Sequence, residues 1–266
     1  MTEISPILLS LIALKAGAKI MEIYASDFDI STKSDASPVT EADAAAEHII
    51  LCELEKLSPE IPVVAEEAVS NGIVPEIGDL FYLVDPLDGT KEFVSKNGEF
   101  TVNIALIKQG EPVVGVVYAP ALGEIFWGVQ GRGAHAARVE NGKVGCPVSL
   151  NVRSAPPKVV AIGSRSHGSA ETEDWLSRYE VESFVAAGSS LKFCRVAQGA
   201  ADIYPRMGRT MEWDTAAGDA VLRAAGGIVT TLDGQPLFYG KRGRAEASDF
   251  ANPYFVAYGD ISLKKD

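Results

Sequence analysis

The hydrophobic rhythm of this chain changes near residue 150. Between residues 100 and 148, short apolar runs are separated by turns that contain glycine, as at Gln109-Gly110 and Asn141-Gly142. This pattern is typical of an antiparallel meander. Beyond residue 151 strands and helices alternate, after a stretch rich in Ser, Asn and Pro at 149–157. We therefore predict an α+β fold in two halves, residues 1–150 with a meander sheet and residues 151–266 of α/β character.

Individual elements follow from the same periodicity. Apolar residues at helical spacing predict an N-terminal helix, and a second helix is expected from Thr40 to Leu57. The buried face predicted for the first helix consists of Ile4, Ile7, Leu8, Leu11 and Ile12. Expected strands in the first half are 61–65, 81–84, 101–107, 112–118 and 124–129. In the second half we expect strands at 158–162, 181–186, 201–204, 228–231 and 254–258, and helices at 171–179, 189–198 and 214–225.

The N-terminal segment does not resemble a targeting sequence. No basic region precedes its apolar run, and Glu3 is acidic. Nowhere do 18 apolar residues follow one another, so we expect no transmembrane span. The three cysteines, Cys52, Cys146 and Cys194, are widely spaced, which argues against a disulfide framework or a zinc site. The expected location is the cytoplasm, and the sequence leaves peripheral association with the inner face of the cell membrane open.

Charge limits the classes of partner. The 266 residues are 47% hydrophobic, which excludes a disordered chain. With 24 basic and 36 acidic residues the formal net charge is −12, so a broad surface for a nucleic acid polymer is not expected. An acidic protein can still bind a small phosphorylated molecule if metal ions reverse the sign of the local charge.

Three acidic clusters lie where apolar segments end. They are Glu66-Glu67, the segment Asp85–Thr90 with Asp85 and Asp88, and Asp214 after Trp213. Unpaired buried carboxylates are costly, and hard cations such as Mg²⁺, which bind oxygen ligands, would remove that cost.

The segment Asp85–Thr90 combines two kinds of ligand. Asp85 and Asp88 are three residues apart in a turn stiffened by Pro86, so both can point to one side, with the Leu87 carbonyl between them. The amides that follow, from Gly89 onward, open a predicted helix and suit an anion. One loop could therefore supply metal ligands and phosphate donors.

Each cluster alone also has a plain structural interpretation. Asp-Pro and Asp-Gly are common in ordinary turns. Glu66 and Glu67 could be a solvated pair, and Asp214 could cap the helix at 215–225. Asp43 lies three residues after Thr40, which is the spacing of a capping box.

Taken together, these segments resemble a known family. The stretches Val39–Asp43, Glu66-Glu67, Asp85–Thr90 and Trp213–Gly218 occur in the order found in the metal-dependent, lithium-sensitive phosphatases that include inositol monophosphatase and fructose-1,6-bisphosphatase. The stretches 91–93, 163–167, 188–194 and 201–206 look like the CysQ-type 3'(2'),5'-bisphosphate nucleotidase branch of that superfamily. The resemblance covers almost the whole chain and implies a layered αβαβα sugar-phosphatase fold.

The resemblance also implies roles for single residues. Two or three Mg²⁺ ions would be bound, with Asp85 bridging two of them and Asp88 and Asp214 completing the second site. Glu66 would be a ligand with Glu67 behind it, although the reverse order stays open. The Leu87 carbonyl would be a further ligand. The pair that polarises the attacking water would be Asp43 and Thr90.

Substrate choice is expected to come from the second half. A nucleotide with two phosphates needs a cationic subsite, for which the matching residues are Lys192 and Arg206. The substrate-binding set implied by the resemblance is Gly89, Thr90, His167, Gly188, Ser189, Lys192 and Arg206. Considered alone, Lys192 could be a solvated surface lysine and His167 a loop histidine.

The implied activity is hydrolysis of the 3'-phosphate of adenosine 3',5'-bisphosphate to AMP and phosphate, by a monomer or homodimer. The alternative in the same superfamily is an inositol or sugar-phosphate monophosphatase, in which Thr-Thr-Asn-Phe typically follows the Asp-Gly pair. This chain has Thr90-Lys91-Glu92-Phe93 at that place. A non-catalytic nucleotide sensor is a third class, but it would be expected to lack a metal ligand or the water-activating pair.

Overall fold

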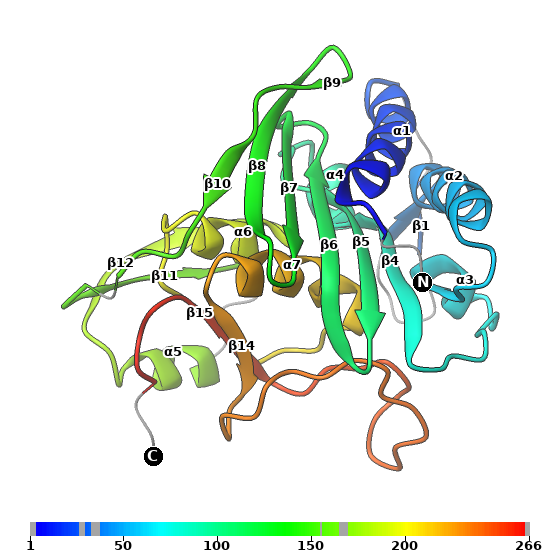
Figure 1. Ribbon diagram of the computed structural model, residues 1–266. Coiled ribbons are helices and arrows are strands. Elements are labelled where there is room, and N and C mark those ends of the chain that lie inside the picture. The colour runs from blue at the N-terminus through cyan, green and yellow to red at the C-terminus, as the bar shows by residue number, and fades with distance from the viewer. Residues whose placement is uncertain (1–3, 27–29, 33–37, 155, 165–169, 264–266) are drawn as a thin grey trace.

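The chain folds into five layers. The computed structural model describes residues 4–26, 30–32, 38–154, 156–164 and 170–263. Helices α1 (Pro6–Tyr24) and α2 (Glu41–Leu57) form the first layer, α6 (Leu191–Ala197) and α7 (Glu212–Ala224) the third, and α5 (Ala170–Leu176) the fifth, with a sheet between each pair of helical layers (Figure 1). The predicted layered α+β fold is confirmed.

The first sheet contains the predicted meander. It has eight strands in the order β10-β8-β7-β6-β5-β4-β3, with β9 paired to β8. All neighbours are antiparallel except β3 and β4. The strands are β3 (Val63–Ala65), β4 (Leu80–Asp88), β5 (Thr101–Lys108), β6 (Glu111–Ala119), β7 (Glu124–Val129), β8 (Gly133–Glu140), β9 (Lys143–Val144) and β10 (Val148–Leu150). A separate hairpin pairs β1 (Ile30–Thr32) with β2 (Pro38–Thr40).

The second sheet is built from the C-terminal part of the chain. Its strand order is β12-β11-β13-β15-β14, with β11 parallel to both neighbours and β15 antiparallel to both of its own. The strands are β11 (Val159–Gly163), β12 (Val181–Ala186), β13 (Ile203–Arg206), β14 (Ile228–Thr231) and β15 (Phe255–Tyr258). Each element predicted beyond residue 151 is present, with ends that shift by up to three residues.

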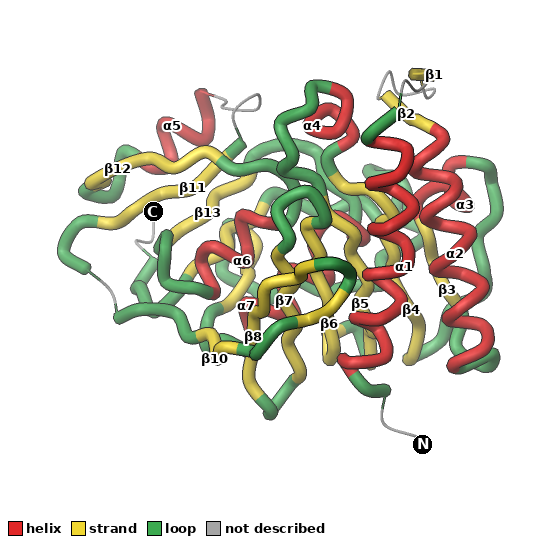
Figure 2. Tube along the Cα trace, turned by 90° about the horizontal axis from the view of Figure 1, so that it is seen from above, coloured by secondary structure: helices red, strands yellow, loops and turns green. Residues whose placement is uncertain are grey.

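The face of α1 that packs on the sheet differs from the prediction. Ile7, Leu8 and Leu11 are exposed, whereas Leu9, Ala13, Ala16 and Ile20 are among its fully buried residues. The first turns of this helix are apolar on nearly every side, so spacing alone could not select the buried face. Figure 2 shows α1 and α2 side by side over the first sheet.

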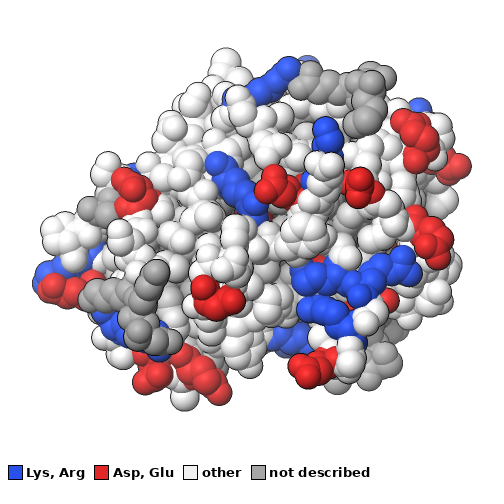
Figure 3. Space-filling model, turned by 60° about the horizontal axis from the view of Figure 1, so that its bottom comes forward, with Lys and Arg blue, Asp and Glu red and all other residues white. Residues whose placement is uncertain are grey.

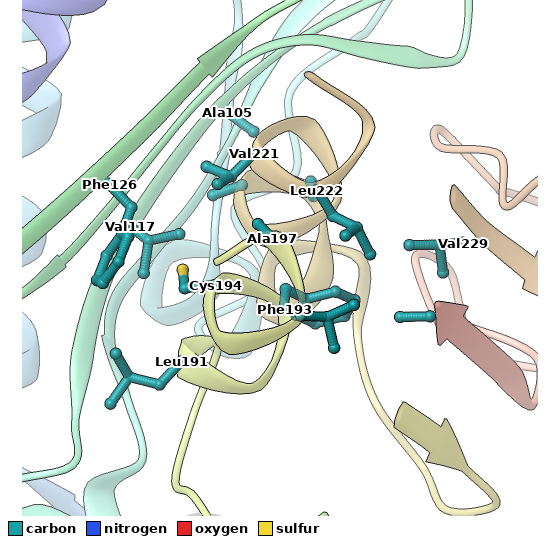
Figure 4. Packing of buried hydrophobic residues seen from close by; sticks show 14 of the residues in the cluster. Ala105, Val117, Phe126, Leu191, Phe193, Cys194, Ala197, Val221, Leu222 and Val229 are labelled. Atoms are coloured by element: carbon teal, nitrogen blue, oxygen red, sulfur yellow. The ribbon is translucent and has the colours of Figure 1, made fainter. Parts of the chain in front are cut away.

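The middle layer joins the two sheets through one hydrophobic core. Phe193, Cys194 and Val221 of the two middle helices pack between first-sheet residues such as Val117 and second-sheet residues such as Val229 (Figure 4). The strands up to Leu150 belong to the first sheet and those from Val159 onward belong to the second, but this core contains residues from both parts of the chain. The division into halves at residue 150 stays a prediction. No helix in the described ranges is long and apolar enough to span a bilayer.

Candidate active site

A cleft of about 260 Å³ gathers most of the predicted site residues. It lies where the end of β4 meets the start of α7 and one side of α6. Its lining comprises Glu66, Asp88, Gly89, Thr90, Lys91, Glu92, Ser164, Ser189, Lys192, Phe193, Tyr204, Arg206, Thr210, Asp214 and Thr215. Asp43, Asp85 and Leu87 are buried and are not in this lining. His167 lies outside the described residues.

The segment Asp85–Asp88 is the bulged end of a strand, so the predicted free turn is wrong. Asp85 is opposite Asn103 and Asp88 is opposite Thr101, so two residues of β4 oppose one of β5 between these pairs. Asp85 Oδ1 accepts a hydrogen bond of 3.0 Å from the Leu87 amide. The strand continues because Leu87 is buried in the core and β5 still offers a partner. The bulge fixes both aspartates to the sheet.

A close contact ties this strand end to the chain before α6. Gly89 has a φ of +89°, and a Cβ there would lie 2.2 Å from Ser189 Oγ. That hydroxyl is 2.7 Å from the Asp88 carbonyl and 2.8 Å from the Glu99 carbonyl, and it can donate to either. Glu99 Oε2 also accepts from the Gly188 amide at 2.9 Å. Gly188 therefore lies beside the cleft, in the segment that presents Ser189 to it.

Several carboxylates lie close together in and beside this cleft. Burial, followed by repulsion from Glu66 and Asp88, raises the pKa of Asp85 well above its ordinary value. Burial and the same two neighbours also raise the pKa of Asp214. Burial raises the pKa of Asp88 to about 6, and the Lys192 cation partly offsets this. Four carboxylates from three elements, α3, β4 and α7, thus lie within electrostatic reach of one another.

This donor set suits a hard divalent cation in its chemistry. Carboxylate oxygens and a strand carbonyl are the ligands that Mg²⁺ takes, and a cation would remove the mutual repulsion. In the parts of the chain that the structure describes, no three acidic, His or Cys side chains converge tightly enough to hold an ion as they stand. The charges and oxygen donors fit a metal, and the side chains would have to adjust around it.

Glu66 and Glu67 separate at the start of α3 (Glu66–Ser70). Glu66 lines the cleft, whereas the side chain of Glu67 is buried elsewhere. The Glu67 amide donates to Glu47 Oε2 at 2.8 Å, so a buried carboxylate of α2 holds this helix start. No sequence pattern indicates a role for Glu47. A solvated pair is excluded for Glu67 by its burial.

Asp43 makes two kinds of contact. Its Oδ2 accepts from the amide and hydroxyl of Thr40, the N-cap of α2, at 2.8 and 2.9 Å, which confirms the predicted capping box. Its Oδ1 lies 3.3 Å from Thr90 Oγ1, which is equally close to the Leu87 carbonyl. The capping role and the contact with Thr90 therefore coexist.

Asp214 is not the N-cap of its helix. Helix α7 begins at Glu212 after Met211, so Asp214 is its third residue. Its carboxylate accepts a hydrogen bond of 2.8 Å from the Met211 amide. Asp214 also lines the cleft.

Lys192 is a buried cation, so the interpretation as a solvated surface lysine is wrong. Its side chain is buried in α6, and Nζ donates to the Ala187 carbonyl at 3.3 Å and lies 5.5 Å from the centre of the Tyr204 ring. Burial lowers its pKa to about 8. Arg206 also lines the cleft, and its Nη2 lies 3.4 Å from the Arg209 carbonyl.

Sequence reasoning missed several residues of the lining, among them Tyr204, Thr210 and Thr215. Tyr204 and Arg206 are two apart on β13, and the period of a strand puts both on one face. That spacing could have identified Tyr204 once Arg206 was considered.

Surface charge is mixed rather than of one sign. On the face shown in Figure 3, acidic and basic side chains lie in small groups among uncharged residues. Positive charge toward a ligand therefore has to come from particular residues of a site rather than from the net charge of −12.

Comparison with known proteins gives a consistent result. The model of the inositol monophosphatase family matches residues 1–258. The chain is 46% identical over 246 residues to the 3'(2'),5'-bisphosphate nucleotidase CysQ of Escherichia coli O157:H7, covering 92% of this chain and 95% of that one. The crystal structure of CysQ from Bacteroides thetaiotaomicron matches with a TM-score of 0.77 and 37% identity over 97% of both chains. The IMPase of Thermotoga maritima matches with a TM-score of 0.74 and 27% identity over 95% of this chain and 91% of that one. The chain belongs to the inositol monophosphatase family.

Proposed function

We propose that this protein is a metal-dependent 3'(2'),5'-bisphosphate nucleotidase that hydrolyses the 3'-phosphate of adenosine 3',5'-bisphosphate to AMP and phosphate. Relatives named for this activity match at about 46% identity over 92% of the chain. The observation that carries the proposal is the cleft itself, which places a buried cation, Lys192, in the same space as the carboxylates of Glu66, Asp88 and Asp214. A substrate with two phosphates could place one phosphate beside metal ions held by the carboxylates and the other beside Lys192.

Phosphatases of this family are generally metal-dependent. In our proposal the metal would be held by Glu66, Asp85, the Leu87 carbonyl, Asp88 and Asp214, and it would be Mg²⁺, with two or three ions in each site. When bound, these ions would lower the pKa of the attacking water and neutralise charge on the phosphate and the leaving oxygen.

The chain's own residues prepare the water and the phosphate. Thr90 Oγ1 can accept a hydrogen bond from the water while its own proton points to Asp43 Oδ1. Asp43 is held by Thr40, so this acceptor has a fixed position. The water oxygen attacks phosphorus as the bond from phosphorus to the 3' oxygen breaks. The proton that the water gives up passes through Thr90 Oγ1 to Asp43 Oδ1, and the 3' oxygen takes up a proton from bulk water as it leaves. Gly89 and Ser189 line the same cleft, and we propose that their backbone amides donate to phosphate oxygens.

Lys192 and Arg206 would bind the second phosphate. Both residues belong to the C-terminal half, and Asp214 is the one proposed metal ligand from that half. We accordingly propose that residues 1–150 supply most metal ligands and that residues 151–266 supply the substrate subsite. We place the enzyme in the cytoplasm, as a monomer or homodimer.

Phosphate release tests this function. Adenosine 3',5'-bisphosphate and inositol 1-phosphate are compared side by side with Mg²⁺, with and without lithium. A strong preference for the nucleotide that lithium inhibits is the expected result. A preference for inositol 1-phosphate would leave the metal chemistry in place but would overturn the substrate assignment.

A further inference from the structure

A buried amide lies between the two parts of the proposed metal site. Asn103, on β5, is fully buried and directly opposite Asp85 in the sheet register. Its Nδ2 lies 3.4 Å from Asp88 Oδ2 and 3.0 Å from Ser190 Oγ. The two protons of one amide group are therefore directed to a carboxylate of the first sheet and to the residue that precedes α6.

Ser190 continues the connection to the other half of the chain. Its hydroxyl is fully buried and donates to the Asp214 carbonyl at 2.7 Å, so it can accept from Asn103. The hydrogen bonds run in one direction, from the amide of Asn103 to the hydroxyl of Ser190 to the backbone of Asp214. Together with the bond from Asn103 to Asp88, these bonds connect residues 15, 87 and 24 positions apart in the sequence.

The amide is not an ordinary core residue. Within the described ranges, Asn103 Oδ1 is buried and accepts no hydrogen bond. A buried acceptor without a donor destabilises the fold, and an apolar side chain of similar size would avoid that cost. The two donors of Nδ2 account for an amide at this position, because one contacts the proposed ligand Asp88 and the other contacts Ser190, which is bonded to the backbone of Asp214.

We propose that Asn103 and Ser190 are positioning residues that set the spacing between Asp88 and Asp214. This inference rests on the proposed function, in which these aspartates bind metal from opposite halves of the chain. Groups that orient metal ligands typically change metal affinity by about 10- to 100-fold when they are removed. Neither residue contacts the substrate or the reacting atoms in this account.

The test uses Asn103→Leu and Ser190→Ala, with Thr101→Val as the matched control. Thr101 lies on the same strand, is equally buried and, in the described part of the chain, has an unpartnered hydroxyl. Two quantities are measured for each variant: the Mg²⁺ concentration that gives half-maximal phosphate release, and the difference in melting temperature between excess EDTA and one fixed, subsaturating Mg²⁺ concentration. The second readout reports metal binding without turnover, since a ligand that binds only the folded state raises its stability.

We expect Asn103→Leu and Ser190→Ala each to raise the required Mg²⁺ concentration about tenfold or more and to reduce the melting shift at subsaturating Mg²⁺. Thr101→Val should match the wild type in both. Because the two residues act in series, the double variant should lose less than the product of the single losses. If Asn103→Leu does not fold, Ser190→Ala decides the question.

An unchanged Mg²⁺ requirement in the folded variants would overturn the positioning role. A variant that melts lower in EDTA but keeps the full Mg²⁺ shift would have a purely structural defect, which also contradicts the inference. If the wild type itself shows neither a Mg²⁺ shift nor Mg²⁺-dependent release, the proposed function fails instead. The two failures are therefore distinguishable.

Discussion

Replacement of Lys192 by Met should separate bisphosphate from monophosphate substrates. The lysine is 6% exposed and lies in the cleft lining beside Asp88 and Arg206. Among the described residues its Nζ donates one hydrogen bond, to a backbone carbonyl, so the ammonium group keeps donors for a ligand anion. Methionine has a similar length and no branch, which preserves the packing of α6.

The magnitude follows from the kind of bond that is lost. A hydrogen bond to a charged group contributes about 1.5–3 kcal/mol, which corresponds to about 10- to 150-fold in kcat/KM. We expect this loss for adenosine 3',5'-bisphosphate and a change of less than about threefold for adenosine 3'-monophosphate, which lacks the second phosphate. Burial already lowers the pKa of Lys192 to about 8, so removing its charge should not destabilise the fold.

The assay is steady-state phosphate release with both nucleotides at saturating Mg²⁺. Lys158→Met serves as the control, since it removes the same charge from an exposed pair with Glu180. Equal losses on the two substrates would refute the role of Lys192 in binding the second phosphate. An unchanged kcat/KM for the bisphosphate would refute it as well.

Three further predictions concern ligands, packing and pH. Asp85→Asn should abolish turnover while circular dichroism shows an intact fold, and full activity would remove Asp85 from the ligand set. Gly218→Ala places a Cβ 2.6 Å from Phe193 Cδ2. This overpacking should destabilise the fold by about 1–3 kcal/mol, which exceeds the gain in helix propensity from alanine, and should lower the melting temperature by several degrees. An unchanged or higher melting temperature would contradict this prediction. Burial raises the pKa of Asp219 from 3.8 to about 6. Its contribution is therefore largest below the unfolded pKa of 3.8 and is lost as pH rises through 6, so urea melts of wild type and Asp219→Asn should diverge by about 2 kcal/mol between pH 4 and 7, and parallel curves would refute this.

Local patterns predicted the elements well because each depends on a short window of sequence. The strands and helices beyond residue 151 are present near the expected positions, and the capping box at Thr40 and Asp43 forms as its spacing indicates. The acidic clusters could be recognised because carboxylates at the ends of apolar segments are unusual whatever the fold.

Features that depend on distant contacts could not be predicted. The buried face of α1 is set by the sheet beneath it, and an all-round apolar helix offers no local preference. The connection between Asn103 and Ser190 joins residues 87 positions apart, and nothing in either segment indicates the other. Asp88 belongs to a bulge rather than a free turn because β5 remains paired beside it. Burial of Lys192 depends in the same way on Tyr204, which comes from a different strand.

Locating bound metal in a crystal would test the proposed ligand set. Crystals soaked in Mn²⁺ can be measured for anomalous scattering, which identifies the ion independently of activity. We expect peaks among Glu66, Asp85, Asp88 and Asp214, and we expect Mg²⁺ to compete for these positions. Peaks elsewhere, or a cleft that stays without metal at concentrations that support phosphate release, would contradict this ligand set.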